Sequence, residues 1–178
     1  MKTRITELLG IRHPVFQAAM SWASSNAPLV IAVSNAGALG VIAAGPMRPE
    51  DFRKALADIR AGTGRPYGVN IPLNNPRAAE LLDIAHEARI PVMVASQGGP
   101  KEHLARFRAL GTKWLHVVAS VEHAKKAEAA GVDALVVDGM EAGGHPPPSE
   151  VTTLVLVRRV VKEVKIPVVA SGVVVMAN

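Results

Sequence analysis

One sequence pattern repeats along this chain and constrains its fold: a helical stretch, then a Gly, Lys or Arg, then a short apolar run. Junctions of this kind stand at Arg89-Ile90-Pro91, Gly131-Val132-Asp133 and Lys165-Ile166-Pro167. The runs that follow lack the alternation of a half-solvated strand, so we expect strands buried on both faces. Repetition at roughly 25 residues is typical of βα units, whose right-handed crossovers produce a parallel sheet.

The same pattern predicts seven strands separated by helices. The expected strands cover residues 14–20, 38–43, 66–71, 90–95, 113–119, 132–137 and 166–170, and the helices begin near Pro28, Pro49, Asn75-Pro76, Pro100, Ser120 and Leu154. A doubly wound open sheet and a closed (β/α)₈ barrel both satisfy this order. Short uniform units without a reversal of topology favour the TIM-type barrel, and we expect one α/β domain over residues 1–178.

Composition removes several classes of function. Aromatic residues make up 3% of the chain, which leaves little for stacking on nucleic-acid bases, and the basic residues behind the net charge of +5 are dispersed at helical spacings. We therefore expect solvated helix faces and no nucleic-acid partner. The chain has no cysteine, which excludes disulfides and thiolate chemistry. Its apolar stretches fall far short of the roughly 20 residues needed to span a bilayer, so we expect a cytoplasmic protein without a membrane partner.

In a barrel of this type the strand ends gather on one rim, where ligands bind. The residues at the expected strand ends are mostly small, apolar or carbonyl-presenting: Ala18, Ala19, Met20, residues 43–45, Asn70, Ala95, Ser96, Val118, Ala119, residues 138–145, Ser171 and Gly172. Histidines and carboxylates do not converge there into a ligand set, so we expect no metal. Such a rim suits a large flat aromatic cofactor.

The stretch from Ala134 to His145 is the strongest candidate for chemistry. Its apolar run stops at Asp138, and Gly143 and Gly144 then allow the backbone to lie directly against a flat ligand. His145 follows with a side chain suited to proton transfer near neutral pH. The alternative is a glycine-rich loop with a capping histidine. An acid pair of Asp138 with Glu141 is a weaker hypothesis, because the sequence does not give their separation.

Three further residues have two interpretations each. Asn70 offers a donor and an acceptor to the polar edge of a ring, or it caps the turn that follows its strand. Met20 and Trp22 could form the floor of a cofactor pocket, but core packing is favoured for either residue alone.

Six segments, residues 14–20, 32–37, 67–70, 129–134, 141–145 and 166–170, together resemble the FMN-dependent nitronate monooxygenases, formerly 2-nitropropane dioxygenases, and the closely similar enoyl-acyl carrier protein reductase II enzymes. The resemblance implies a flavoprotein oxidoreductase on a TIM barrel. It places Ala18, Ala19 and Met20 against FMN, Asn70 at its polar edge, Asp138 at the ring, and Gly143 and Gly144 close to the cofactor. Ser171 and Gly172 belong to the loop after strand seven, which typically helps to hold phosphate in such barrels.

His145 matches the active-site histidine of that family. In a nitronate monooxygenase it would take the α-proton of a small nitroalkane substrate or hold the nitro group, the flavin would accept an electron, and oxygen would complete the reaction. The alternative is an NAD(P)H-dependent enoyl-acyl carrier protein reductase II. Three segments resemble that branch of the family: residues 1–9, 139–145 and 152–157. A basic chain suits an acidic carrier protein. Nitronate oxidation ranks first because it requires no nicotinamide site and no carrier-docking surface.

The chain departs from the family pattern after strand seven. The family continues with a helix, an eighth strand and a phosphate-gripping segment, whereas this chain ends at Asn178. We therefore expect an incomplete FMN-binding barrel, truncated after strand seven, with the last helix and eighth strand missing. An exposed strand edge invites pairing into a homo-oligomer. The alternative of another class is a truncated, non-catalytic fragment that binds FMN poorly.

Overall fold

The computed structural model describes residues 1–144 and 150–172, and the chain divides into two compact units, Met1–Trp114 and Leu115–Asn178. Each unit is built from parallel strands joined through helices. We describe the two units separately.

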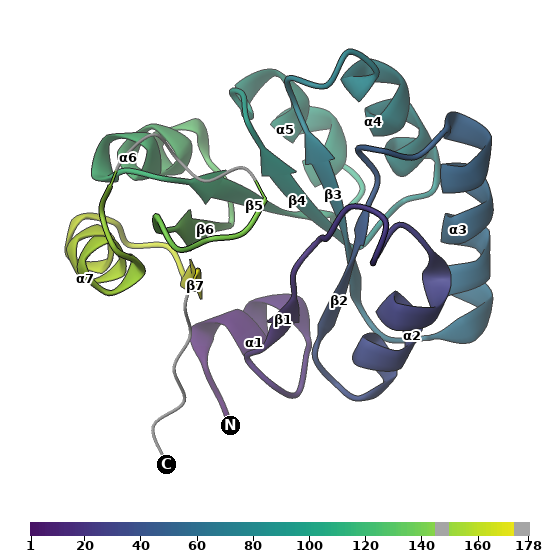
Figure 1. Cartoon of the computed structure of the whole chain (residues 1–178), viewed down its shortest axis with the longest axis horizontal. Coiled ribbons are helices and arrows are strands. Elements are labelled where there is room, and N and C mark those ends of the chain that lie inside the picture. The colour runs from purple at the N-terminus through teal and green to yellow at the C-terminus, as the bar shows by residue number, and fades with distance from the viewer. Residues whose placement is uncertain (145–149, 173–178) are drawn as a thin grey trace. The chain divides into compact units, whose positions relative to one another are not determined.

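In the first unit four strands pair in parallel and in chain order: β1 (Phe16–Gln17), β2 (Leu39–Ala43), β3 (Tyr67–Pro72) and β4 (Val92–Ser96). Five helices accompany them, α1 (Arg4–Leu9), α2 (Ala27–Asn35), α3 (Pro49–Gly62), α4 (Ala78–Glu87) and α5 (Lys101–Arg108), and Figure 1 shows α2, α3 and α4 beside the strands that they connect. All five residues of β2 are buried, as expected for a strand covered on both faces.

Helix α3 illustrates how local sequence sets these elements. Pro49 stands in its first turn, where the missing N–H costs nothing, and acidic residues follow in the same turn. Phe52, Leu56 and Ile59 recur at helical spacing and are buried. The apolar stripe is therefore buried, while the charged residues of the helix face solvent.

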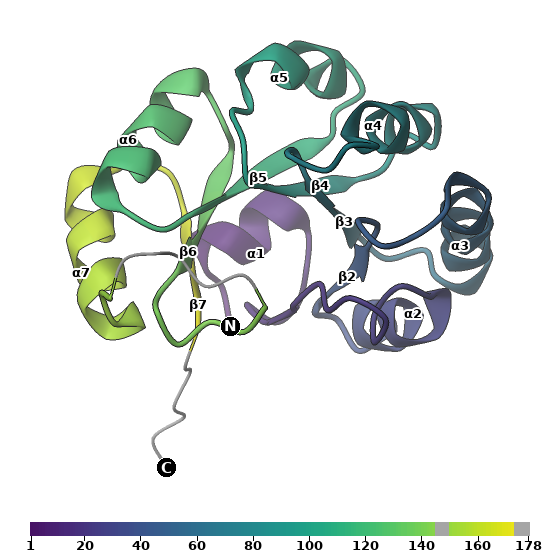
Figure 2. The same cartoon turned by 45° about the horizontal axis from the view of Figure 1, so that its top comes forward.

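The second unit contains most of β5 (Lys113–Val118), which begins in the first unit, together with β6 (Ala134–Asp138) and β7 (Val168–Ser171). β5 pairs in parallel with β6, and β6 with β7. Helices α6 (Val121–Ala130) and α7 (Thr153–Glu163) contact each other and lie beside these strands (Figure 2). The Ser120 hydroxyl caps α6, and Gly131, with φ of 97°, ends it in the left-handed conformation.

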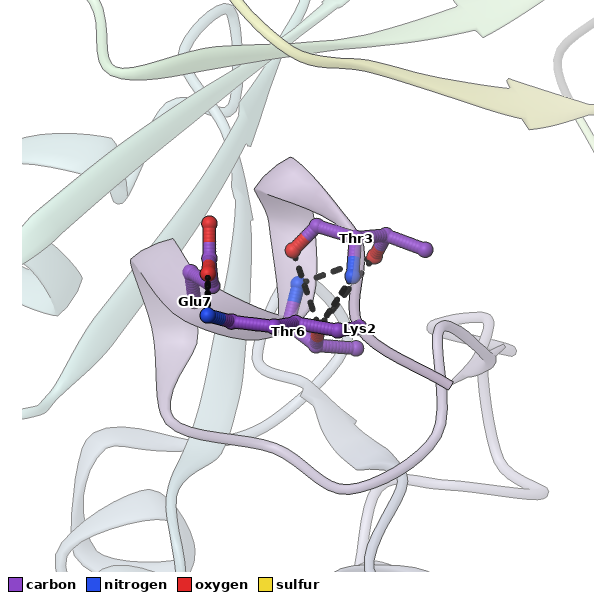
Figure 3. A network of polar contacts seen from close by, with 4 residues as sticks. All are labelled: Lys2, Thr3, Thr6 and Glu7. Atoms are coloured by element: carbon purple, nitrogen blue, oxygen red, sulfur yellow. Dashed lines mark hydrogen bonds and ion pairs between the residues drawn. The ribbon is translucent and has the colours of Figure 1, made fainter.

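All seven expected strands are present in the described residues, with ends shifted by a few residues. Two local expectations need correction. No helix was expected before residue 14, yet Thr3 and Thr6 form a reciprocal capping box that starts α1, with a Lys2–Glu7 ion pair at 2.9 Å beside it (Figure 3). Asn75 does not cap α4, because its Oδ1 accepts from the Arg77 amide at 2.8 Å and the helix starts later, at Ala78.

Candidate active site

In the first unit, the segment after β1 has a fixed backbone and exposed side chains. The Met20 amide donates to the Ser24 hydroxyl at 2.8 Å, and the Ser24 amide donates to the Met20 carbonyl at 2.8 Å. Ser24 is completely buried, so it anchors this loop from beneath. Ala18 is exposed and Ala19 is half-buried. The backbone of this segment is thus held in place while its side chains remain open to a ligand.

The core-packing interpretation of Met20 and Trp22 is wrong. Met20 is 44% exposed and Trp22 is 77% exposed, which is far from the burial of a core residue. Trp22 also has φ of 69°, a left-handed conformation that is uncommon outside glycine. The structure places both side chains at the surface of the first unit.

Asn70 lies near the end of β3 and is half-buried. Its Nδ2 donates to the Val94 carbonyl of β4 at 2.8 Å, so the amide reaches across to its register partner instead of capping a turn. Among the described residues its Oδ1 accepts no hydrogen bond. The side chain is therefore oriented by the protein and keeps an acceptor for a ligand.

In the second unit, Asp138 and Ser171 are register partners at the ends of β6 and β7. Burial raises the pKa of the Asp138 carboxyl, and a hydrogen bond from the Ser171 side chain offsets part of that rise. A half-buried carboxyl at a strand end, held by one hydroxyl, can accept from or donate to a ligand according to its protonation.

The loop after β6 is tied to the start of α7. Oε2 of Glu141 accepts from the amide and from the hydroxyl of Thr153, each at 2.8 Å, and hydrogen bonding led by the amide keeps the pKa of Glu141 below its usual value. Asp138 and Glu141 thus have separate partners, and the structure does not support an acid pair. Thr153 is 2% exposed and had no role in the sequence predictions.

The glycines of this region divide into two kinds. A Cβ on Gly139 or Gly172 would lie within about 2 Å of the Thr153 hydroxyl, at 2.2 and 2.1 Å, so both are required by packing. A Cβ on Gly143 or Gly144 would meet nothing within 4 Å, and Gly144 has φ of 90°. Both glycines are exposed among the described residues, and the approach of a flat ligand to their backbone stays a prediction. The predicted catalytic residue, His145, lies outside the described residues.

The described residues fit a flavin within each unit taken alone. The pyrimidine edge of a flavin ring alternates hydrogen-bond acceptors with an N–H donor. The oriented amide of Asn70 and the half-buried carboxyl of Asp138 can each hydrogen-bond to either kind of group. Ala18 and Ala19 add small side chains that permit a flat ring to approach. Across residues 1–144 and 150–172, no cluster of three or more metal-ligating side chains occurs and no helix is long and apolar enough to cross a membrane.

Comparison with solved structures defines the class. FabK from Thermotoga maritima superposes with a TM-score of 0.89 at 43% identity, over 94% of this chain and 53% of that chain. A nitroalkane oxidase from Streptomyces ansochromogenes superposes with a TM-score of 0.81 at 30% identity, over 93% of this chain and 60% of that one. The fold class is therefore α/β of the (β/α)-barrel type, as the repeat predicted.

The family model described as nitronate monooxygenase matches residues 2–89 and 80–177. The chain belongs to the nitronate monooxygenase family, whose members are generally flavin-dependent. Two relatives are a Mycobacterium tuberculosis (3aS,4S,5R,7aS)-5-hydroxy-7a-methyl-1-oxo-octahydro-1H-indene-4-carboxyl-CoA dehydrogenase, 39% identical over 97% of this chain and 48% of its own length, and a Pseudomonas aeruginosa nitronate monooxygenase, 32% identical over 97% and 62%. The chain spans about half the length of the first of these relatives.

Proposed function

We propose that this chain supplies FMN-contacting residues and proton-handling groups of a flavin-dependent oxidoreductase that oxidises alkyl nitronates or nitroalkanes with O₂. The observation that carries the proposal is the family match, which runs through both units of the chain. Strand-end groups of suitable chemistry, Asn70 in the first unit and Asp138 with Ser171 in the second, support it.

Bound FMN would supply the redox chemistry of the reaction. The protein's share is binding and proton handling: Ala18, Ala19 and Met20 contact the ring, Asn70 and Asp138 bind its polar atoms, and Gly143 and Gly144 allow close approach. Ser171 and Gly172 at the end of β7 contribute to the cofactor site. His145 acts as the base that removes the α-proton of a nitroalkane, or it holds the nitro group.

FMN uptake by the purified full chain tests the cofactor. We expect quenching of FMN fluorescence on titration, and an affinity reduced about tenfold or more in Asp138→Ala, because a hydrogen bond to an oriented polar group is lost. Asp51→Ala, which removes an exposed carboxylate from α3, is the matched control and should bind like wild type. A chain that takes up no FMN would contradict the proposal and favour the non-catalytic alternative.

Nitronate-dependent oxygen uptake by the FMN-loaded chain tests the reaction. His145→Ala should lower nitroalkane turnover by about 10²-fold or more, the usual contribution of a general base. Turnover of preformed nitronate should fall less, because its proton is already gone. Undiminished nitroalkane turnover in His145→Ala would remove this residue from the mechanism.

A second substrate class, acyl thioesters, is favoured by sequence identity. FabK, an enoyl-acyl carrier protein reductase II, at 43% and the CoA dehydrogenase at 39% are more similar to this chain than the nitronate monooxygenase at 32%. The corresponding activity is NAD(P)H-dependent reduction of an enoyl thioester, with an acyl carrier protein as partner. Crotonyl-thioester reduction with NADH, measured beside nitronate oxidation on the same preparation, decides between them: the substrate with the higher kcat/KM identifies the class.

A further inference from the structure

We propose that Glu141 is a positioning residue. Acting through Thr153, it fixes residues 139–144 after β6 and the end of β7. These parts of the second unit carry Gly143, Gly144, Ser171 and Gly172, and they adjoin Asp138 at the end of β6. The role of this positioning in cofactor binding rests on the proposed function, because Asp138, Gly143, Gly144, Ser171 and Gly172 are proposed cofactor contacts. The arrangement itself rests on hydrogen bonds and packing within the second unit.

The Glu141 carboxylate takes the place of a local helix cap. Thr152 is the N-cap residue of α7, yet its side chain makes no capping hydrogen bond. The first helical amide, that of Thr153, donates instead to Glu141 Oε2 at 2.8 Å, across a separation of 12 residues. An anionic group is favourable at a helix N-terminus, where free amides and the helix dipole point outward. A cap from the preceding loop stabilises the helix and closes the loop at once.

A backbone hydrogen bond closes the loop at the same place. The Met140 amide donates to the Val151 carbonyl at 3.0 Å, and the Ala142 amide donates to the Gly139 carbonyl at 3.0 Å. Together with the Glu141 carboxylate, these contacts join residues 139–142 to residues 151–153. Gly143 and Gly144 follow directly after the closed turn.

Thr153 connects this loop to β7. Its hydroxyl donates to Glu141 Oε2 at 2.8 Å and lies 3.3 Å from the Ser171 carbonyl, which also accepts from the Gly139 amide at 3.2 Å. The side chain fills a slot between Gly139 and Gly172 that a Cβ on either glycine would block. Movement of Thr153 would therefore disturb the backbone of β7 at Ser171, the residue whose hydroxyl bonds Asp138.

Amide hydrogen exchange of the full chain without FMN tests the positioning role directly. In Glu141→Ala we expect exchange at Gly139, Met140, Ala142 and Thr153 to speed up about tenfold or more, because local opening is no longer opposed by the cap. Exchange in α6 should stay within about twofold of wild type. Glu141→Gln keeps an acceptor oxygen and should recover most of the protection.

Glu122→Ala is the matched control, since it removes an exposed glutamate that pairs with Lys126 on α6. It should leave the loop amides unchanged. Loop protection in Glu141→Ala equal to wild type would overturn the proposal. Equal acceleration in the loop and in α6 would also overturn it, because that pattern means general destabilisation and not local positioning.

A double-mutant cycle tests the connection through Thr153. Thr153→Val keeps the shape in the glycine slot and removes the hydroxyl, so we expect its effect on loop exchange and that of Glu141→Ala to combine to less than their product. Independent, multiplicative effects would contradict a shared contact. In a chain that binds FMN, Glu141→Ala should also weaken FMN binding about tenfold, with Glu141→Gln near wild type. Absence of FMN binding in wild type contradicts the proposed function alone, because the exchange experiment needs no cofactor.

Discussion

Gly139→Ala is the substitution whose effect the structure specifies most closely. A methyl group there would lie 2.4 Å from the Thr153 amide nitrogen and 2.5 Å from its Cα, as well as 2.2 Å from its hydroxyl oxygen. Backbone atoms cannot move aside by changing a rotamer, so α7 or the end of β6 must shift. Thr153 is buried at the start of α7, and its slot has little room for adjustment.

The expected magnitude follows from two opposing terms. Overpacking of this severity costs about 3 kcal/mol, the upper end of the usual range. Replacing glycine lowers the entropy of the unfolded chain and returns roughly 0.5 to 1 kcal/mol. The net loss is therefore about 2 to 2.5 kcal/mol, which corresponds to a melting temperature lower by roughly 4 to 10 °C in a chain of this size.

Urea unfolding followed by circular dichroism measures this difference, with Gly143→Ala as the control. A Cβ at Gly143 meets nothing within 4 Å, and the residue does not have positive φ, so alanine there should be neutral or stabilising by up to about 0.5 kcal/mol. The two variants make the same chemical change at positions four residues apart in the chain. If Gly139→Ala unfolds within about 0.5 kcal/mol of Gly143→Ala, the packing argument is refuted.

Three further predictions concern stability. Since burial raises the folded-state pKa of Asp138, ionisation of this carboxyl opposes folding, and stability should fall as pH rises through that pKa. Asp138→Asn should flatten this fall in urea unfolding measured between acidic and neutral pH. Parallel stability curves for the two proteins would count against the assignment. Ser120→Ala removes the side chain that accepts from the His123 amide at 3.0 Å and should cost about 1 kcal/mol in thermal unfolding, whereas no loss would show that the cap is dispensable. Thr112→Val removes a buried donor to the Ile90 carbonyl at 2.7 Å and should cost about 1 to 2 kcal/mol in urea, while a stabilised variant would contradict this.

The parts of the fold that the sequence predicted well depend on local signals. The ends of α3 and α6 follow from Pro49, Ser120 and Gly131, whose preferred conformations are set by their own backbone and neighbours. Helix α1 was missed because six residues give too short a period to recognise, and its capping box uses Thr6 where the usual signature has Glu or Gln.

The candidate site shows the same division. Asn70, Asp138 and Ser171 could be proposed from sequence, since each lies at or near the end of an expected strand, where ligands bind in barrels of this type. The two exposed glycines could be proposed from residue type, because glycine allows close approach of the backbone. The exposure of Met20 and Trp22 could not, because an apolar residue type does not reveal what covers it. The bond from Asn70 to the Val94 carbonyl requires the register of two strands that are 24 residues apart.

The sequence by itself determined the repeating βα order and the residue types offered at the strand ends, since both follow from periodicity and from the conformational limits of Gly and Pro. Only the tertiary structure decided that Glu141 caps α7 from 12 residues away and that Gly139 and Gly172 form a slot for Thr153. Those contacts join segments whose approach is set by strand pairing and helix packing. A hydrogen bond or a close contact acts over a few ångströms in space, and distance along the chain does not predict it.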